Sequence, residues 1–142
     1  MVVMKPLPQS DRAIVLRTSC SDAAAWDAIR LAIETPVDGF FAYVNFVDDT
    51  EYEGITKEQV LELFRQCSGD TFVIVADDAS MAGEHPLRVI DLVTEPGREF
   101  RAVPSAVQAI ENNLSISNMD FAEFAESVDA DGVFRHFPSP GR

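Results

Sequence analysis

Acidic side chains gather where the apolar segments end in the first half of the sequence. Asp48 and Asp49 follow one apolar segment, and Asp77 and Asp78 follow the next. Two such pairs, if the fold brought them together, would offer Mg²⁺ the carboxylate oxygens that it prefers. They would equally suit a Lys or Arg of a partner, or they are simply turn residues, since Asp is common in turns. All three interpretations are open from the sequence.

A histidine stands in the loop that follows the second acidic pair. A carboxylate beside the His85 imidazole would raise the pKa of the ring, and the two groups together could transfer protons. His85, Asp77 and Asp78 are therefore the catalytic candidates, for a reaction that needs no metal. His136 lies near the end of the chain, and both histidines could equally be ordinary loop residues.

The two cysteines differ in their surroundings. Cys20 lies where an extended segment gives way to a helix, and the positive end of a helix dipole lowers the pKa of a thiol. Asp22 opposes this effect and no His is nearby in the sequence, so we expect a passive thiol. Cys67 has the spacing of a core residue on its helix. The pair forms no C-x-x-C motif, so the sequence predicts neither a zinc site nor a dithiol redox centre.

The segment 110–120 is the most distinctive stretch of the sequence. Its amide, hydroxyl and carboxylate side chains alternate with apolar ones. They can hold a loop through bonds to its own backbone, or they can offer hydrogen bonds to a bound peptide. Asp91 and Asn45 raise a related question, because each stands in an apolar strand and needs an internal partner unless it lines a pocket. The residues predicted to bind a partner are Asp22, Asp48, Asp49, Glu111, Asn112, Asn113, Asn118 and Asp120.

Extended and helical patterns alternate along the chain and must position these residues. Extended segments are expected at 13–17, 40–47, 71–76, 87–93, 100–103 and 133–137. One helix is indicated by Trp26, Ile29 and Ile33, and others are opened by Thr56-x-x-Gln59, Ser105-x-x-Gln108 and Ser117-x-x-Asp120. Glu95-Pro96-Gly97 predicts a type II turn, because it supplies Pro and Gly at the two central positions.

This order of elements predicts a single α/β domain over residues 13–137, preceded by an N-terminal arm (1–12) and followed by a frayed tail (138–142). Right-handed crossovers make the first three strands parallel. The later strands extend the sheet in antiparallel fashion, which gives a mixed sheet with helices packed on it. The carboxyl ends of the first three strands then share one edge, where open α/β sheets bind ligands.

The charge balance limits the classes of partner that the chain can bind. The chain has 24 Asp and Glu against 11 Lys and Arg, a formal net charge of −13. Nucleic acid and anionic membranes are disfavoured, since both are bound through Lys and Arg. A basic protein or peptide is the natural complement, although the charge can serve solubility alone. The ten Phe exceed what the predicted core needs, so a homodimer is a further expectation. We expect no metal and no cofactor. Without a leader or an apolar run that spans a bilayer, a cytoplasmic protein with free thiols is expected.

Several motifs carry a resemblance to a known family. They are Val15-Leu16-Arg17-Thr18, Ser21-Asp22-x-x-Ala25-Trp26, Val47-Asp48-Asp49, Glu95-Pro96-Gly97, Glu111-Asn112-Asn113-Leu114-Ser115 and Asn118-Met119-Asp120-Phe121. They resemble a family of small acidic domains of unknown function from Streptomyces-type actinobacteria. The resemblance covers residues 11–137 and implies no assigned chemistry. The family usually has an Asp and an aromatic residue where this chain has Ser19 and Cys20, which argues against a catalytic Cys20.

The chain is also loosely similar to accessory proteins of lanthipeptide pathways, such as those that form lysinoalanine cross-links. Such proteins hold a peptide so that its own groups react, and the similarity carries over no particular residues. The first functional hypothesis is an acidic accessory protein that holds a basic protein or peptide. The second is a metal-independent peptide-modifying enzyme of a lanthipeptide-type pathway, acting by positioning and proton transfer. The third is a Mg²⁺ site at the Asp pairs.

Overall fold

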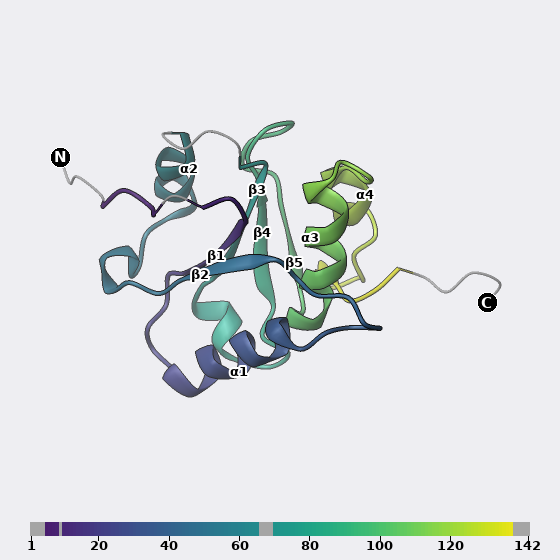
Figure 1. Cartoon of the computed structure of the whole chain (residues 1–142). Helices are drawn as coiled ribbons and strands as arrows, with labels where there is room; N and C mark the ends of the chain where they lie inside the picture. Colours follow the sequence, from purple (N-terminus) through teal and green to yellow (C-terminus); the bar gives the residue numbers. More distant parts are fainter. Residues whose placement is uncertain (1–4, 9, 66–69, 138–142) are drawn as a thin grey trace.

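The computed structural model describes residues 5–8, 10–65 and 70–137 (Figure 1). The strands are β1 (Ala13–Arg17), β2 (Val44–Val47), β3 (Phe72–Ala76), β4 (Leu87–Asp91), β5 (Glu99–Ala102) and β6 (Val133–Phe134). The helices are α1 (Ala23–Glu34), α2 (Lys57–Arg65), α3 (Val107–Ser115) and α4 (Phe121–Ala125), with short 3-10 turns η1 (Thr50–Tyr52), η2 (Asp78–Met81) and η3 (Pro104–Ala106). The predicted order of strands and helices is confirmed. The predictions for Cys67 and the tail 138–142 fall outside the described residues.

The strands form one sheet in the order β2-β1-β3-β4-β5-β6. β1 pairs in parallel with β2 and β3, whereas β4 runs antiparallel to β3 and β5 antiparallel to β4. The predicted mixed sheet, with its parallel first half, is therefore confirmed. The last strand differs from the expectation, because β6 pairs with β5 in parallel. The chain passes through α3 and α4 between these strands, and such a crossover returns it in the same direction.

Helices cover both faces of the sheet (Figure 1). Val15, Ile74 and Val89 pack against α1, α3 and α4 on one face. The other face buries their neighbours in the strands against α2 and η1. Because successive side chains of a strand point to opposite faces, strands covered on both sides are apolar throughout. The short apolar segments of the sequence reflect this double burial.

Most of the phenylalanines belong to the core. The buried ones are Phe64, Phe72, Phe100, Phe121, Phe124 and Phe134. On the face that carries α4, the rings of Phe100, Phe124 and Phe134 pack edge to face or stacked, with centroids 5.2 to 6.4 Å apart. Because the core accounts for these six phenylalanines, the number of Phe is a weaker reason to expect a homodimer than the sequence suggested. Two phenylalanines, Phe40 and Phe41, are exposed.

Two predicted local signals are confirmed. The Thr56 hydroxyl accepts the Gln59 backbone N–H at 3.2 Å, and the Gln59 side-chain oxygen accepts the Thr56 N–H at 2.8 Å. This reciprocal pair is the capping box that opens α2. In the β4–β5 hairpin, Arg98 N–H donates to the Glu95 carbonyl at 2.9 Å, and Gly97 has φ +95°. A positive φ at this position defines the predicted type II turn.

Two predicted helix caps are wrong. Ser105 lies inside η3 and α3 begins only at Val107, with no side-chain cap. Pro104 supplies the fixed φ that starts the turn, so no hydroxyl cap is needed there. Asp120, not Ser117, caps α4, and it forms a capping box with Glu123. The positive end of the short helix also stabilises a carboxylate at this position.

The N-terminal arm is held against the domain at the described residues. Leu7 is buried beside α2 and η1. The Tyr52 hydroxyl, also buried, donates towards the carbonyls of Lys5 and Pro6, each at 2.9 Å. The Lys5 ammonium pairs with Asp49 of the loop after β2. In the part of the chain that the structure describes, no helix has the length and apolar character to cross a bilayer.

Candidate functional site

The carboxyl ends of β1, β2 and β3 share one edge of the sheet. Leu16 of β1 lies opposite Val47, the last residue of β2, and Arg17 lies opposite Ala76, the last residue of β3. The two acidic pairs therefore leave the sheet at the same edge, with β1 between them. The predicted common edge is confirmed, but it does not form one uncompensated negative patch, because each pair has its own cation.

Asp77 is held by an arginine from the far side of β4. The two terminal guanidinium nitrogens of Arg101 donate to the Asp77 carboxylate, at 2.7 and 2.8 Å, and the Ser80 hydroxyl donates to it at 3.1 Å. Burial acts to raise the pKa of Asp77, but the bonds and charge of Arg101 outweigh it and hold the pKa below its ordinary value. A carboxylate so stabilised in its charged form clamps η2 to β5 and is a poor proton acceptor.

His85 lies close to this clamp in the chain but has another partner. Its Nδ1 is 3.0 Å from the Ser80 carbonyl oxygen. Because a carbonyl only accepts, Nδ1 carries the proton in this contact. Within the described ranges, no hydrogen bond or ion pair joins His85 to Asp77 or to the exposed Asp78. A catalytic role for these three residues stays a prediction.

The other acidic pair also has cations. The Arg17 guanidinium donates to Asp48 at 3.1 Å and to the Ser19 carbonyl at 2.9 Å. Asp49 accepts from Lys5, and this hydrogen bond lowers the pKa of the Asp49 carboxyl. Among residues 5–8, 10–65 and 70–137, no three His, Cys, Asp or Glu side chains come together in a way that would hold a metal ion. The convergence that the Mg²⁺ hypothesis required is therefore not found in those residues.

Cys20 does not have the activated thiol that a helix start favours. A hydrogen bond with Glu53 and burial together raise the pKa of Cys20, and the Arg17 charge only partly offsets them. The helix beside it is capped by Asp22, whose carboxylate accepts the Ala25 N–H at 3.0 Å. Asp22, predicted to bind a partner, thus serves the first turn of α1.

The two polar residues in the strands have internal partners. Asp91, only 3% exposed, accepts the backbone N–H groups of Val93, Thr94 and Glu95 at 2.9 to 3.2 Å. It therefore shapes the β4–β5 hairpin. Asn45 of β2 donates to the Ser10 hydroxyl. Asn45 fits the structural alternative that the sequence left open, whereas Asp91 has internal partners and also lines a hollow.

The predicted binding residues of segment 110–120 line two separate hollows. Asn118 donates to the Asn113 side-chain oxygen at 2.8 Å, which folds the chain back on α3. Asn118 and Asp120 line a hollow of about 390 Å³ beside Asp91. Glu111, Asn112 and Asn113 line another hollow, of about 530 Å³, which we call the aromatic groove. Its lining is Phe40, Tyr43, Gln108, Glu111, Asn112, Asn113 and Ile116.

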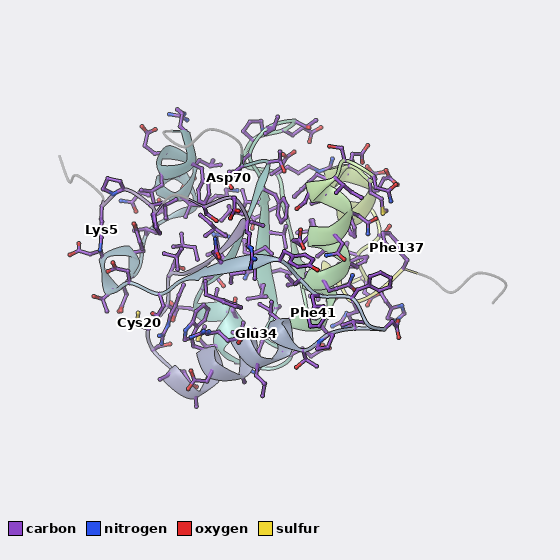
Figure 2. All side chains as sticks on the ribbon, in the orientation of Figure 1. Lys5, Cys20, Glu34, Phe41, Asp70 and Phe137 are labelled. Atoms are coloured by element: carbon purple, nitrogen blue, oxygen red, sulfur yellow. The ribbon has the colours of Figure 1, made fainter. Side chains whose placement is uncertain are left out.

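One wall of the aromatic groove is the segment 40–43, which precedes β2. The sequence predicted a strand there, but the ladder begins only at Val44. Phe40, Phe41 and Tyr43 are 61%, 51% and 54% exposed, and Figure 2 shows Phe41 on this stretch between α1 and β2. Side chains of α3 hold the segment: Asn112 donates to the Phe41 carbonyl and Glu111 accepts the Tyr43 N–H, at 2.8 and 2.7 Å. The aromatic side chains are thus presented to solvent on a fixed backbone.

The floor of the groove contains a carboxylate without a cation. Glu111 is 4% exposed. Its Oε1 accepts both the Tyr43 N–H and the Asn112 amide. Within the described part of the chain, no hydrogen bond reaches its Oε2 and no Lys, Arg or His pairs with it. A buried charge is costly unless it is paired. In the described residues Asp91 also lacks a cation, but three backbone N–H groups bind its two oxygens, whereas Glu111 has hydrogen bonds to one oxygen alone.

Sequence reasoning found the polar half of this groove and missed the apolar half. Glu111, Asn112 and Asn113 were predicted from their pattern. Phe40 and Tyr43 were assigned to the extended segment 40–47, and the apolar residues of 110–120 were not among the predicted binding residues. No sequence signal separated 40–43 from 44–47, because neither Pro nor Gly interrupts this largely apolar stretch.

Comparisons with known proteins give a family but no activity. A search of curated proteins finds no match. The family model described as "Domain of unknown function (DUF6924)" matches residues 12–137, which include the whole sheet and the aromatic groove. The chain therefore belongs to the DUF6924 family of domains of unknown function.

Proposed function

We propose that this domain is a binding module that holds a basic segment of a protein or peptide in the aromatic groove. The observation that carries the proposal is Glu111, a carboxylate in the groove floor that lacks a cation in the described structure. A Lys or Arg from a partner would supply the missing charge. In the complex, the cation of the partner would offset the free-energy cost of burying the Glu111 carboxylate.

The walls of the groove suit a peptide. Phe40, Tyr43 and Ile116 present exposed apolar surface at its rim, and exposed apolar groups that cluster mark interaction sites. Aromatic rings also attract a cation over their faces. The groove volume of about 530 Å³ falls in the range of ligand pockets, which is about 300 to 1,000 Å³. It has room for a basic side chain and an apolar neighbour.

Charge favours a basic partner over a second copy of this chain. Each copy has a formal net charge of −13, so two copies repel each other at long range, whereas a basic segment is attracted. Fixing the wall of the groove beforehand also lowers the ordering cost of binding. A basic partner therefore agrees with the negative charge of the chain and with the fixed wall of the groove.

The test is isothermal titration calorimetry with N-acetylated, C-amidated decapeptides that contain Lys, Arg and Leu, against counterparts with Glu in place of the basic residues. The basic peptides should bind and the acidic ones should not. Glu111→Gln should weaken binding by about tenfold or more, because a buried charge loses its partner. The substitution keeps the Oε1 acceptor on which Tyr43 and Asn112 depend.

Glu58→Gln is the matched control. Glu58 is an exposed residue of α2, on the other face of the sheet, and its substitution changes the net charge by the same amount. It should change affinity by less than about twofold, because an exposed charge far from the ligand is screened by salt. Equal effects of the two substitutions would show charge attraction without a site and would overturn the proposal. A stable dimer in light scattering that is lost on Tyr43→Ser would also overturn it, since a second copy would then occupy the groove.

A further inference from the structure

The strongest hydrogen-bonding group left open in the aromatic groove is an acceptor, one oxygen of a carboxylate. Both sites of Glu111 Oε1 are taken, by the Tyr43 N–H at 2.7 Å and the Asn112 amide at 2.8 Å. Glu111 Oε2 is open within the described residues. A ligand therefore meets one free carboxylate oxygen rather than two.

The amide side chains of α3 leave one further acceptor open, beside one N–H each of Gln108 and Asn113. Asn112 donates twice, to Glu111 and to the Phe41 carbonyl, so its NH₂ group is fully used. Gln108 donates to the Asn112 side-chain oxygen at 3.0 Å. No hydrogen bond from the described part of the chain reaches Gln108 Oε1. Gln108 Oε1 is therefore a second open acceptor in the groove, beside Glu111 Oε2.

The aromatic wall accepts cations as well. The Arg12 guanidinium lies over the Tyr43 ring, 5.8 Å from its centroid, although Arg12 does not line the groove. Arg12 already occupies one face of the Tyr43 ring, so a ligand cation would use the other face of this ring or the Phe40 ring. The Phe40 ring at the rim is another apolar surface for the stem of a long side chain.

From this arrangement we propose that the groove selects a primary ammonium group, that of a lysine side chain, over a guanidinium. The inference rests on the proposed function and deepens it. A lysine ammonium has three donors and no acceptor, which match Glu111 Oε2, Gln108 Oε1 and an aromatic face. An arginine fork pairs best with two oxygens of one carboxylate, and one of the two is already saturated here. A trimethylated ammonium keeps the charge but has no N–H to donate.

The experiment uses a neutral decapeptide, acetylated and amidated at its ends, with one variable residue: Lys, Arg, trimethyllysine or acetyllysine. Calorimetry measures each against the full chain. The Lys peptide should bind about tenfold more tightly than the Arg and trimethyllysine peptides, about the value of one hydrogen bond to a charged group. A fifth peptide, with norleucine at the variable position and a free N-terminus, separates a lysine side chain from an α-ammonium group.

Gln108→Met tests the second acceptor. It should weaken the Lys peptide by about fivefold or more and leave the trimethyllysine peptide unchanged, since only the former donates to Oε1. Arg or trimethyllysine binding as tightly as Lys would overturn the ammonium inference while basic-peptide binding itself persisted. Tighter binding of the free N-terminus than of the lysine side chain would replace lysine by an α-ammonium group. Loss of binding for all basic peptides would instead overturn the proposed function.

Discussion

The clamp between Asp77 and Arg101 gives a stability prediction that can be worked out from its geometry. Arg101→Ala removes three charge-assisted hydrogen bonds, two to Asp77 and one to the Pro86 carbonyl, and leaves the Asp77 carboxylate part-buried, with its side chain 22% exposed. Hydrogen bonds to charged groups are worth about 1.5 to 3 kcal/mol each when buried, whereas exposed ion pairs are worth less than about 1 kcal/mol. Since both partners are about a quarter exposed, we expect a net loss of about 2 kcal/mol.

Urea denaturation followed by far-UV circular dichroism measures this loss. With an m-value of about 1.5 kcal/mol/M for a domain of this size, the midpoint should fall by about 1.3 M. Arg98→Ala is the control, because Arg98 precedes β5 and pairs only at 3.4 and 3.6 Å with exposed carboxylates. Its midpoint should shift by less than about 0.3 M, as for most surface changes. Equal midpoints for the two variants would refute the reasoning.

The clamp also has a defined dependence on pH. The pKa of Asp77 in the folded chain lies below the ordinary value of 3.8. A carboxyl with a depressed folded pKa contributes its stability in full above the unfolded pKa and loses it as the pH falls through the folded pKa. The stability difference between the native chain and Arg101→Ala should therefore be constant from neutral pH to about pH 5 and shrink below about pH 4. A difference that grew on acidification would contradict this sign.

Further predictions concern the hairpin, the groove and the thiol. Asp91→Ala should cost about 2 kcal/mol, because three backbone N–H groups lose their acceptor; an unchanged urea midpoint would contradict this. Gly97→Ala should cost about 1 kcal/mol, since φ +95° is strained for other residues; thermal unfolding measures the cost, and an equal or higher melting temperature would disprove it. Glu111→Gln should leave the urea midpoint unchanged or raise it, because it removes an uncompensated buried charge; a clear fall would disprove this. In a Cys67→Ser background, Cys20 should react slowly with iodoacetamide near neutral pH and faster in alkali, because Glu53 and burial raise its pKa; rapid alkylation near neutral pH would disprove this.

The sequence predicted the strands that are buried on both faces and the caps and turns that depend on residues close in sequence. The apolar segments at 13–17 and 71–76 became β1 and β3 with bounds within one residue, because strands covered on both faces leave a continuous apolar signal. The Thr56 capping box and the Gly97 turn were predicted for the same reason, since each rests on bonds between residues close in sequence. The parallel pairing of β6 was missed, because a two-residue strand has no periodicity to detect.

The candidate site was predicted only in part, for reasons of long-range contact. Sequence reasoning placed Asp77 at the correct edge of the sheet, but its partner Arg101 lies two strands away and no spacing rule connects them. Glu111 was selected for its polar neighbourhood, yet its importance comes from the cation that it lacks, which only the structure shows. The exposure of Phe40 depends on the end of the ladder at Val44, which follows from pairing with β1.

The surroundings of Trp26 supply an optical readout for these experiments. It is the only tryptophan in the chain, it is 2% exposed, and its indole N–H has no hydrogen bond within the described structure. Its emission should therefore be blue in the folded state and shift to the red on unfolding. The ring lies under the Arg17 guanidinium and meets Phe46 edge-on, with centroids 5.9 Å apart. Because Phe46 belongs to the strand that continues directly from the wall of the groove, occupancy of the groove should be detectable as a change in intrinsic emission, without any label.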